Sequence, residues 1–367
     1  MRKKLWQLHS VVGLLAGLGL LLIGLTGSLL IFHEELDQLF FSQQHHAEPV
    51  GAGRLPLDEL IARVEAAHPD KAVTGWHFAQ DGSKEADGVY VMPFGTREWR
   101  YLTLDPYRGI LLTQPKPHGE TLKGWLLSLH ESLFLKDIGL AISGLLGVAL
   151  CLLSLSGIIL YRRFWKTLFR LRFRASFRML SADLHRLVGV FSVIPNLILG
   201  ITGAYWNLGH TIEHLLETEE EHAAIAAQEP LFYEKLFAPD FSVEALVSKA
   251  NKEIPGFQTA FISFPWAPEG PFTLWGQKDT ASPLRNSTGS WVSFDSQTGD
   301  PLSHYDLTEQ SAWTQLIDSF EPLHFGTFGG LPVKIFYSLA GLGPGILTLS
   351  GTAIWWSRRK KAQLRRP

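Results

Sequence analysis

Four histidines in this sequence recur as two matched pairs, and the imidazole of histidine is a common metal ligand. His9 and His185 begin gap-free matches at an offset of 176 residues, and His130 and His324 begin matches at an offset of 194 residues. The first match continues through Gly13, Gly24, Thr26 and Gly27, with counterparts Gly189, Gly200, Thr202 and Gly203. The second continues through Phe134, Gly147, Leu155, Ser156 and Gly157, with counterparts Phe328, Gly341, Leu349, Ser350 and Gly351. Each match adjoins a long apolar stretch, which is the arrangement expected of imidazoles that hold haem iron inside a bilayer.

The elements that would position these histidines are membrane spans. A span takes about 20 mostly apolar residues, and we predict four, within residues 1–33, 136–161, 185–208 and 332–357. Basic residues concentrate at the N-terminus, in the loop 162–184 and in the tail 358–367, so the positive-inside rule places these pieces and both termini in the cytoplasm. The first span is expected to be an uncleaved anchor, and Pro195-Asn196 predicts a kink in the third.

Composition excludes several other classes of protein. The net charge of −2 hides basic clusters that lie beside apolar runs, which is typical of a membrane protein and not of a nucleic-acid-binding surface. The single cysteine, Cys151, allows no disulfide within the chain and makes a thiolate metal site improbable. The chain has no evident nucleotide-binding motif.

The two segments outside the spans, 34–135 and 209–331, predict two related α+β domains. In each, a helix is followed by strands that end in a hairpin with a Gly- or Pro-containing turn. In the first segment the expected elements are 57–67, 88–92, 99–104 and 110–113. In the second they are 243–252, 259–264, 271–276, 291–294 and 300–304. The fold class is therefore a four-helix membrane protein with two small outer domains, formed by a parallel internal duplication.

On the cytoplasmic side the choice of iron ligands is narrow. Of the 14 histidines, only His9 and His185 lie near that face, so they are the predicted ligands of an inner haem. His9 and His33 cannot share one iron, because they are about 36 Å apart along a helix that rises roughly 1.5 Å per residue. Gly13 and Gly189 lie one turn after the two ligands, where a missing side chain would leave room for a porphyrin edge.

On the outer side there are five candidate ligands, which are His33, His130, His210, His214 and His324. The match between the halves selects His130 with His324. His33 and His210 have no counterparts, so they are second-tier candidates, as ligands or as neighbours of a haem propionate or a substrate. A single histidine at a membrane interface is more often a half-buried polar residue than a ligand. Two matched pairs favour ligation, because ionisable residues beside spans are uncommon and usually functional.

Taken in order, these motifs resemble those of the PepSY-associated transmembrane family. The resemblance lies in Leu-His at 8–9, 129–130, 184–185 and 323–324, in Gly-x-Thr-Gly at 24–27 and 200–203, and in Leu-Ser-Gly at 155–157 and 349–351. It covers nearly the whole chain, and within the family the likeness is to FoxB-type ferric-siderophore reductases of the bacterial inner membrane. It implies two haem b groups, no catalytic residue beyond the haem, and PepSY-like domains in the periplasm.

The function that this resemblance implies is electron transfer across the membrane to a periplasmic ferric siderophore, which would release Fe(II). An external cytoplasmic electron donor is then required, and a flavin reductase is one candidate. The basic loop 162–184 would attract anionic membrane lipid or dock that donor, and lipid is the favoured interpretation.

Two other classes of function remain as alternatives. A membrane-tethered regulator or peptidase inhibitor built from PepSY domains would leave the four matched histidines without a role. A transporter of iron complexes is disfavoured, because the predicted spans carry no ionisable residue at their centres.

Overall fold

The computed structural model of this chain describes residues 2–49, 53–80, 82–161, 163, 168–216, 237, 241–266 and 270–363. The predicted basic loop lies outside this range at 162 and 164–167, and so does the end of the tail at 364–367. The chain divides into two compact units. The helical unit contains Met1–Phe32, Leu126–Glu217 and Leu323–Pro367, and the sheet unit contains His33–Trp125 and Thr218–Pro322.

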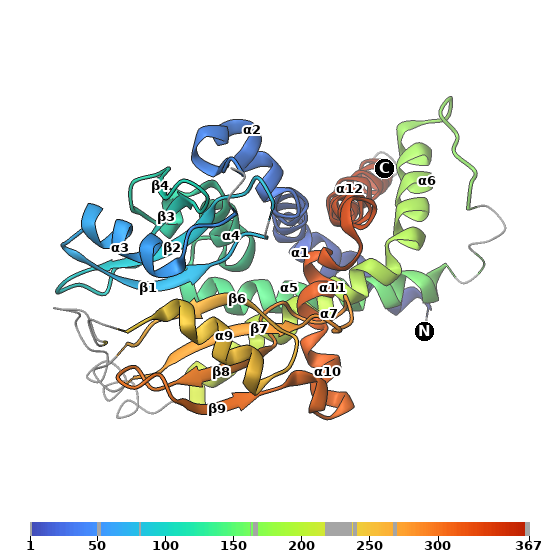
Figure 1. The fold of residues 1–367 in the computed structure, drawn as a ribbon. Coiled ribbons are helices and arrows are strands. Elements are labelled where there is room, and N and C mark those ends of the chain that lie inside the picture. Colours follow the sequence, from blue (N-terminus) through green and yellow to red (C-terminus); the bar gives the residue numbers. More distant parts are fainter. Residues whose placement is uncertain are drawn as a thin grey trace. The chain divides into compact units, whose positions relative to one another are not determined.

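Long apolar helices make up most of the helical unit (Figure 1). They are α1 (Arg2–Leu30), α5 (Lys136–Leu160), α6 (Phe177–Phe191), α7 (Val193–Leu216) and α12 (Gly330–Gln363). Among the described residues, α1, α5 and α12 are each long and apolar enough to cross a membrane, and the bent pair α6–α7 gives a fourth span if it is counted as one. The chain is therefore a membrane protein, and these helices coincide with the predicted spans.

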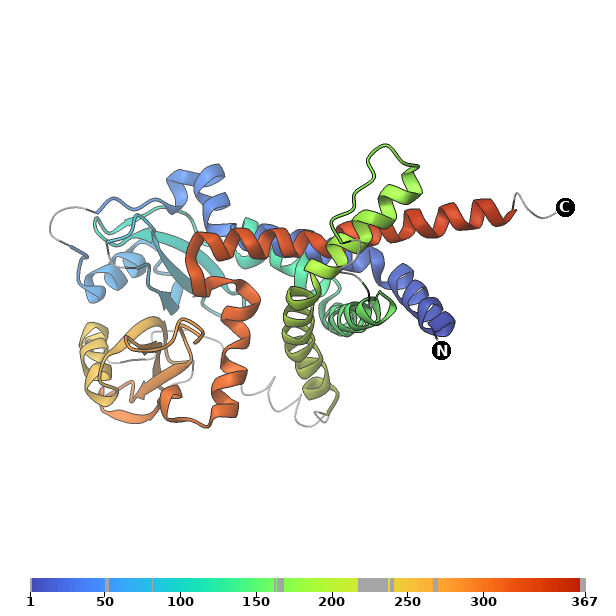
Figure 2. The ribbon, with the colours of Figure 1, turned by 90° about the vertical axis from the view of Figure 1, so that its right-hand side faces the viewer.

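The third predicted span is sharply bent. Helices α6 and α7 meet at Ser192 with an angle of 64° between them, and the bend is visible in Figure 2, where the light-green α6 turns away from α7. Pro195 has no N–H to donate to the carbonyl of Phe191, four residues earlier, so the helix breaks one turn before the proline. The kink predicted at Pro195-Asn196 thus falls at Ser192, and the Asn196 amide donates to the Ser192 hydroxyl at 3.2 Å.

Glycines bring the long helices into close contact at two places. Helix α1 packs on α12, where a Cβ added at Gly24 would lie 2.4 Å from the Gly341 carbonyl oxygen. Helix α5 packs on α7, where a Cβ added at Gly147 would lie 2.8 Å from the Gly200 carbonyl oxygen. Only glycine permits backbones to approach this closely. The two contacts join residues that are counterparts in the sequence matches, because Gly24 corresponds to Gly200 and Gly147 to Gly341.

An antiparallel sheet forms the centre of the sheet unit. In the described residues its strands are β1 (Lys71–His77), β2 (Asp87–Pro93), β3 (Arg100–Asp105), β4 (Ile110–Leu111), β5 (Lys116–Pro117), β6 (Phe257–Ser263), β7 (Phe272–Lys278), β8 (Ser290–Phe294) and β9 (Pro301–Tyr305). Their order is β4-β3-β2-β1-β6-β7-β8-β9, and β5 pairs with β3. The order reads the same outward in both directions from the β1–β6 junction, where Trp76 pairs with Ile262.

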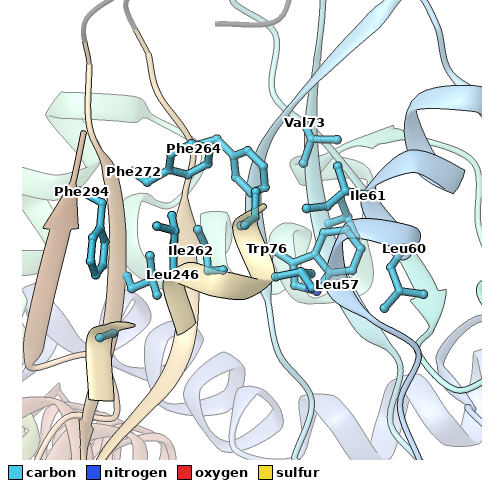
Figure 3. Packing of buried hydrophobic residues seen from close by; sticks show 14 of the residues in the cluster. Leu57, Leu60, Ile61, Val73, Trp76, Leu246, Ile262, Phe264, Phe272 and Phe294 are labelled. Carbon is cyan, nitrogen blue, oxygen red and sulfur yellow. The ribbon is translucent and has the colours of Figure 1, made fainter. Parts of the chain in front are cut away.

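The two outer segments, which the sequence predicts as two related domains, are joined edge to edge in this one sheet through the pairing of β1 with β6. Helices α3 (Leu57–Ala67) and α9 (Val243–Glu253) contribute to a single core with the strands of both segments. Figure 3 shows this core, with Trp76 and Ile61 on one side of the junction and Ile262 and Phe272 on the other. The unit also contains the helices α2 (His33–His45) and α10 (Ala312–Asp318). Local periodicity could not reveal the pairing of β1 with β6, because these strands are about 180 residues apart.

The first turns of α3 and α9 cap each other. The Asp58 carboxylate accepts hydrogen bonds from the Val243 N–H at 2.7 Å and the Glu244 N–H at 3.2 Å. In return, the Glu244 carboxylate accepts one from the Leu57 N–H at 2.6 Å. Carboxylates satisfy the unpaired N–H groups of a helix start and complement its dipole. The exchange therefore joins the two segments through polar contacts as well as through their core.

We expect Asp87→Ala to destabilise the sheet unit by about 3–5 kcal/mol, because the Arg54 guanidinium, the Trp76 indole and the Ala79 N–H would all lose the carboxylate that they share. The Asp87 side chain is fully buried and accepts hydrogen bonds from Arg54, from the Trp76 indole at 2.8 Å and from the Ala79 N–H at 2.9 Å. Urea unfolding of the full chain in detergent, followed by tryptophan fluorescence, measures the change. The control is Asp70→Ala, which removes the ion pair between the exposed Asp70 carboxylate and Lys71 and should cost far less stability. Equal losses in the two variants would contradict this account of Asp87.

Candidate functional site

The structure brings together the two histidines that were predicted at the cytoplasmic side. His9 lies on α1 and His185 on α6, both within the helical unit. Their ring centres are 6.3 Å apart, and the ring planes stand at 80° to each other. Residues that are 176 positions apart in the sequence thus form one pair.

The outer histidines form a second pair in the same unit. His130 lies on α4 (Leu122–Ser132) and His324 on α11 (Phe320–Phe325), the two helices that lead from the sheet unit into the helical unit. Their ring centres are 6.1 Å apart with an interplanar angle of 69°. The Trp206 ring lies 5.3 Å from the His324 ring and closes one side of the pair.

Both ring separations fit a pair of imidazoles that faces one iron from opposite sides. A metal–imidazole bond is about 2 Å long and the ring centre lies roughly 1 Å behind the nitrogen, so two such rings have centres about 6 Å apart. The steep angles between the planes are compatible with this arrangement, because each ring can turn about its own metal–nitrogen bond. The separations of 6.3 and 6.1 Å therefore pass this test for a haem iron.

In all four histidines the Nδ1 atom has a hydroxyl partner. The His9 Nδ1 lies 2.7 Å from the Ser156 hydroxyl, and the His185 Nδ1 lies 3.0 Å from that of Ser350. The other two contacts are His130 with Thr26 at 3.2 Å and His324 with Thr202 at 2.7 Å. These hydroxyls are counterparts in the sequence matches, so the same kind of hydroxyl contact recurs in both halves of the chain.

The hydroxyl protons are already committed, and this determines the direction of the bonds. Ser156 and Ser350 donate to backbone carbonyls one turn earlier, and so do Thr26 and Thr202. A hydroxyl that donates its one proton to a carbonyl accepts from the imidazole, so this arrangement favours an Nδ1 that carries the hydrogen. The Nε2 lone pair is left available, and in the described residues no hydrogen bond occupies it. A neutral imidazole held at Nδ1 in this way is the form that binds a metal.

A glycine follows each of these hydroxyl residues and lies against the histidine ring. A Cβ added at Gly27 would lie 2.8 Å from the Cε1 atom of His130. The corresponding distances to the ring carbon are 3.2 Å at Gly351, 3.4 Å at Gly203 and 3.7 Å at Gly157. The hydroxyl–glycine dipeptide therefore combines a hydrogen-bond acceptor with space for the ring. The sequence contains the signal, because the dipeptide occurs at four matched positions, but its spacing does not indicate which ring each hydroxyl contacts.

The room predicted for a porphyrin edge at Gly13 and Gly189 stays a prediction, and His33 and His210 do not belong to either pair. A Cβ at Gly13 would make only ordinary contact with Leu153, at 3.6 Å, and one at Gly189 with Leu347, at 3.5 Å. His33 begins α2 in the sheet unit, so it belongs to the other unit from the two pairs. His210 is exposed on α7 and stacks on His214, with ring centres 6.5 Å apart.

A buried carboxylate anchors the segment that carries His185. Asp183 is fully buried two residues earlier on α6 and accepts hydrogen bonds from the Arg172 guanidinium at 2.8 and 2.9 Å. Arg186 adds an ion pair with Asp183 at 3.2 Å, and its guanidinium also lies 5.7 Å from the centre of the Tyr161 ring. The loop that precedes α6 is thus tied to the helix beside the inner pair.

Helix α1 relates the two pairs to each other. It carries His9 of the inner pair near its start, and Thr26, which contacts His130 of the outer pair, near its end. Seventeen residues at about 1.5 Å each correspond to roughly 26 Å along the helix axis. The two pairs therefore lie near opposite ends of a helix that is long enough to span a bilayer.

The outer pair is backed by polar contacts that fix the helix carrying His130. The Asn207 amide donates to the backbone carbonyl of Glu131 at 3.1 Å and to the Ser143 hydroxyl at 2.6 Å. Burial raises the pKa of the Glu131 side chain above its usual range. No group of three or more His, Cys, Asp or Glu side chains suited to a metal ion occurs in the part of the chain that the structure describes. The two histidine pairs are thus the candidate site.

Comparison with known proteins agrees with this architecture. The chain is 29% identical to an uncharacterized protein of Pseudomonas aeruginosa over 262 residues, which cover 65% of this chain and 64% of that protein. The aligned region therefore spans somewhat less than two thirds of the relative's length. A model of the PepSY-associated TM region matches residues 6–358, which include both histidine pairs and every described helix of the helical unit in whole or in part. The chain accordingly belongs to the family defined by the PepSY-associated TM region.

Proposed function

We propose that this protein is a di-haem electron-transfer protein that reduces a ferric chelate, a siderophore by its resemblance, on the outer side of the bacterial inner membrane. His9 and His185 would hold one b-type haem, and His130 and His324 the other. The observation that carries the proposal is the geometry of the pairs, with ring centres 6.3 and 6.1 Å apart and all four Nδ1 atoms engaged. Bis-histidine haem supplies one-electron transfer.

The residues of the chain would hold and space the haems in this function. Each imidazole would present its Nε2 to the iron, and the hydroxyls of Ser156, Ser350, Thr26 and Thr202 would keep the hydrogen on Nδ1. Helix α1 sets the two pairs about 26 Å apart along its axis. No side chain has to donate or remove a proton during the reaction, so the protein contributes position, ligation and local polarity.

The orientation in the membrane is part of the proposal. Arg172 and Arg186 contact Asp183 two residues before His185, and Arg358 lies over the ring of Trp6, three residues before His9. The positive-inside rule then places the inner pair near the cytoplasm. The sheet unit is then periplasmic. A cytoplasmic donor, for which a flavin reductase is a candidate, would supply the electrons, because no nucleotide-binding motif is evident in the chain.

An internal duplication accounts for the recurrence of the contacts. Gly24 on Gly341 and Gly200 on Gly147 are the same contact made twice, with the halves exchanged. Two other features also repeat when the halves are exchanged. They are the order of the strands about the β1–β6 junction and the mutual caps of α3 and α9. We infer that two copies of one ancestral unit assembled about a pseudo-twofold axis that relates His9 to His185 and His130 to His324.

The ferric chelate is proposed because reduction weakens its hold on the metal. Siderophores bind Fe(III) through hard oxygen donors, which suit the softer Fe(II) less well. One electron per Fe(III) would therefore release the iron as Fe(II) and leave the chelator intact.

The test is optical and quantitative. Protein purified after expression with sufficient haem should contain about two haems per chain and show the spectrum of low-spin bis-histidine haem. When the reduced protein is mixed anaerobically with a ferric hydroxamate chelate, it should reoxidise, and a ferrous-specific indicator should record one Fe(II) per electron transferred. The iron-free chelator is the control and should leave the haem reduced.

Other results would favour the alternative functions. A purified protein without a Soret band would remove the redox proposal and support a membrane-tethered regulator. A haem protein that stays reduced in the presence of ferric chelates would keep the electron-transfer function and exclude this class of acceptor. Uptake of a ferric chelate into vesicles without a reductant would instead support a transporter.

A further inference from the structure

The two histidines of each pair are not held equally, and this difference rests on backbone contacts that the sequence matches do not contain. The His185 Nδ1 has a second partner, the Leu347 carbonyl oxygen at 3.1 Å, and the His130 Nδ1 has the Ile23 carbonyl oxygen at 2.9 Å. The structure gives the His9 and His324 Nδ1 atoms no such carbonyl, and their partners among the described residues are the hydroxyls of Ser156 and Thr202. Each pair thus combines one doubly supported ring with one singly supported ring.

The two singly supported rings have the shorter hydroxyl contacts. The distance is 2.7 Å both for His9 with Ser156 and for His324 with Thr202. The doubly supported rings lie at 3.0 Å from Ser350 and 3.2 Å from Thr26. A ring with a carbonyl partner keeps its Nδ1 hydrogen without the hydroxyl, because a carbonyl oxygen can only accept. A ring that relies on one hydroxyl loses both its tautomer preference and a restraint on its orientation when that hydroxyl is removed.

We propose that Ser156 and Thr202 are the positioning residues that set the tautomer and orientation of His9 and His324, whereas Ser350 and Thr26 only reinforce rings that backbone carbonyls already hold. The proposal deepens the proposed function, because its consequence for haem rests on these histidines being iron ligands. Its consequence for the imidazole tautomer does not depend on haem. Ser156 therefore matters more than its counterpart Ser350, and Thr202 more than its counterpart Thr26.

The first experiment uses the full chain without haem. Nitrogen-15 NMR of selectively labelled histidine at neutral pH distinguishes an imidazole with its hydrogen on Nδ1 from one with it on Nε2. Spectra of the single His→Ala variants assign the signals. In the unaltered chain all four rings should carry the hydrogen on Nδ1. Ser156→Ala should shift His9 towards the other tautomer, and Thr202→Val should do the same to His324. Ser350→Ala and Thr26→Val should leave the hydrogen of His185 and His130 on Nδ1.

The second experiment uses the haem-loaded protein. Loss of the partner that orients a metal-bound histidine typically weakens the affinity for the metal group by about 10- to 100-fold. We expect losses of this size for the inner haem in Ser156→Ala and for the outer haem in Thr202→Val, each with a change in that haem's midpoint potential. The corresponding losses in Ser350→Ala and Thr26→Val should be several times smaller. Thr202→Ser keeps the hydroxyl and should restore both affinity and potential.

A matched control is available on the helix that carries Ser156. Ser154 is also buried on α5 and donates one turn back to the Leu150 carbonyl, but it has no hydrogen bond to a histidine among the described residues. Ser154→Ala should change neither the tautomers nor the midpoint potentials. Equal effects of Ser156→Ala and Ser350→Ala, or a Thr202→Ser variant that behaves like Thr202→Val, would overturn the proposal. A chain that binds no haem but shows the expected tautomer changes would refute the proposed function alone.

Discussion

We expect His185→Ala and His324→Ala each to reduce the haem content of the purified protein from two to about one per chain, because bis-histidine ligation fails when one axial ligand is missing. The two variants should lose different haems. The one that remains in His185→Ala should titrate with one of the two midpoint potentials of the unaltered protein, and the one in His324→Ala with the other. The pyridine haemochrome assay gives the haem content, and a spectroelectrochemical titration gives the potentials.

The choice of variants makes this result specific. His9→Ala should match His185→Ala, and His130→Ala should match His324→Ala, because each pair is formed by rings about 6 Å apart. His304→Ala is the control, since His304 is a half-exposed residue of β9 whose Nδ1 lies 3.8 Å from a carboxylate oxygen of Glu253. If every variant lost both haems while the chain kept its helical circular dichroism, the assignment of two independent pairs would be wrong.

The second large effect is expected from a single methyl group. Gly27→Ala should abolish the outer haem and leave the inner one, because the new Cβ would lie 2.8 Å from the Cε1 atom of His130, on a ring confined by Thr26 and the Ile23 carbonyl. The ring has to move to relieve this contact, and it then leaves the position from which it would ligate the iron. The expected result is a haem content of about one per chain, with the inner midpoint potential unchanged.

The other ring-facing glycines allow the effect to be graded. The distance of the added Cβ from the ring rises from 3.2 Å at Gly351 to 3.4 Å at Gly203 and 3.7 Å at Gly157, so the loss of haem should fall in this order. Gly209→Ala is the neutral control, because in the described part of the chain no atom outside its own helix backbone lies within 4 Å of its added Cβ, and alanine favours the helix. If Gly157→Ala lost as much haem as Gly27→Ala, contact with the ring could not be the cause.

Much of this protein can be predicted from local patterns in its sequence. The long apolar runs predict the spans, since the length that crosses a bilayer depends on the residues of the run alone. Helix α3 begins and ends where its apolar spacing predicts, at Leu57 and Ala67, and α9 extends the predicted 243–252 by one residue. Strand β1 was missed, because a register shift between Val73 and Gly75 interrupts its alternation and leaves four consecutive residues buried.

The kink in the third span is predicted from the sequence in kind but not in its position. Pro195 alone predicts that a helix hydrogen bond is lost, and the fixed geometry of the helix places the break one turn earlier. The candidate site is likewise predicted only in part by the sequence. Matching of the halves selected His9 with His185 and His130 with His324, and these rings meet in the structure. Their role as iron ligands is a proposal that the haem measurements above decide.

The amino-acid sequence by itself determined the apolar spans, most of the outer elements and the equivalence of the histidines, because each depends on residue type and spacing along the chain. Only the tertiary structure decided that the outer strands form one sheet and that Ser156, Ser350, Thr26 and Thr202 hold the rings. It also decided which rings gain a second, backbone partner. The physical reason is that a hydrogen bond between residues more than 100 positions apart depends on how whole helices pack, and no local pattern records it.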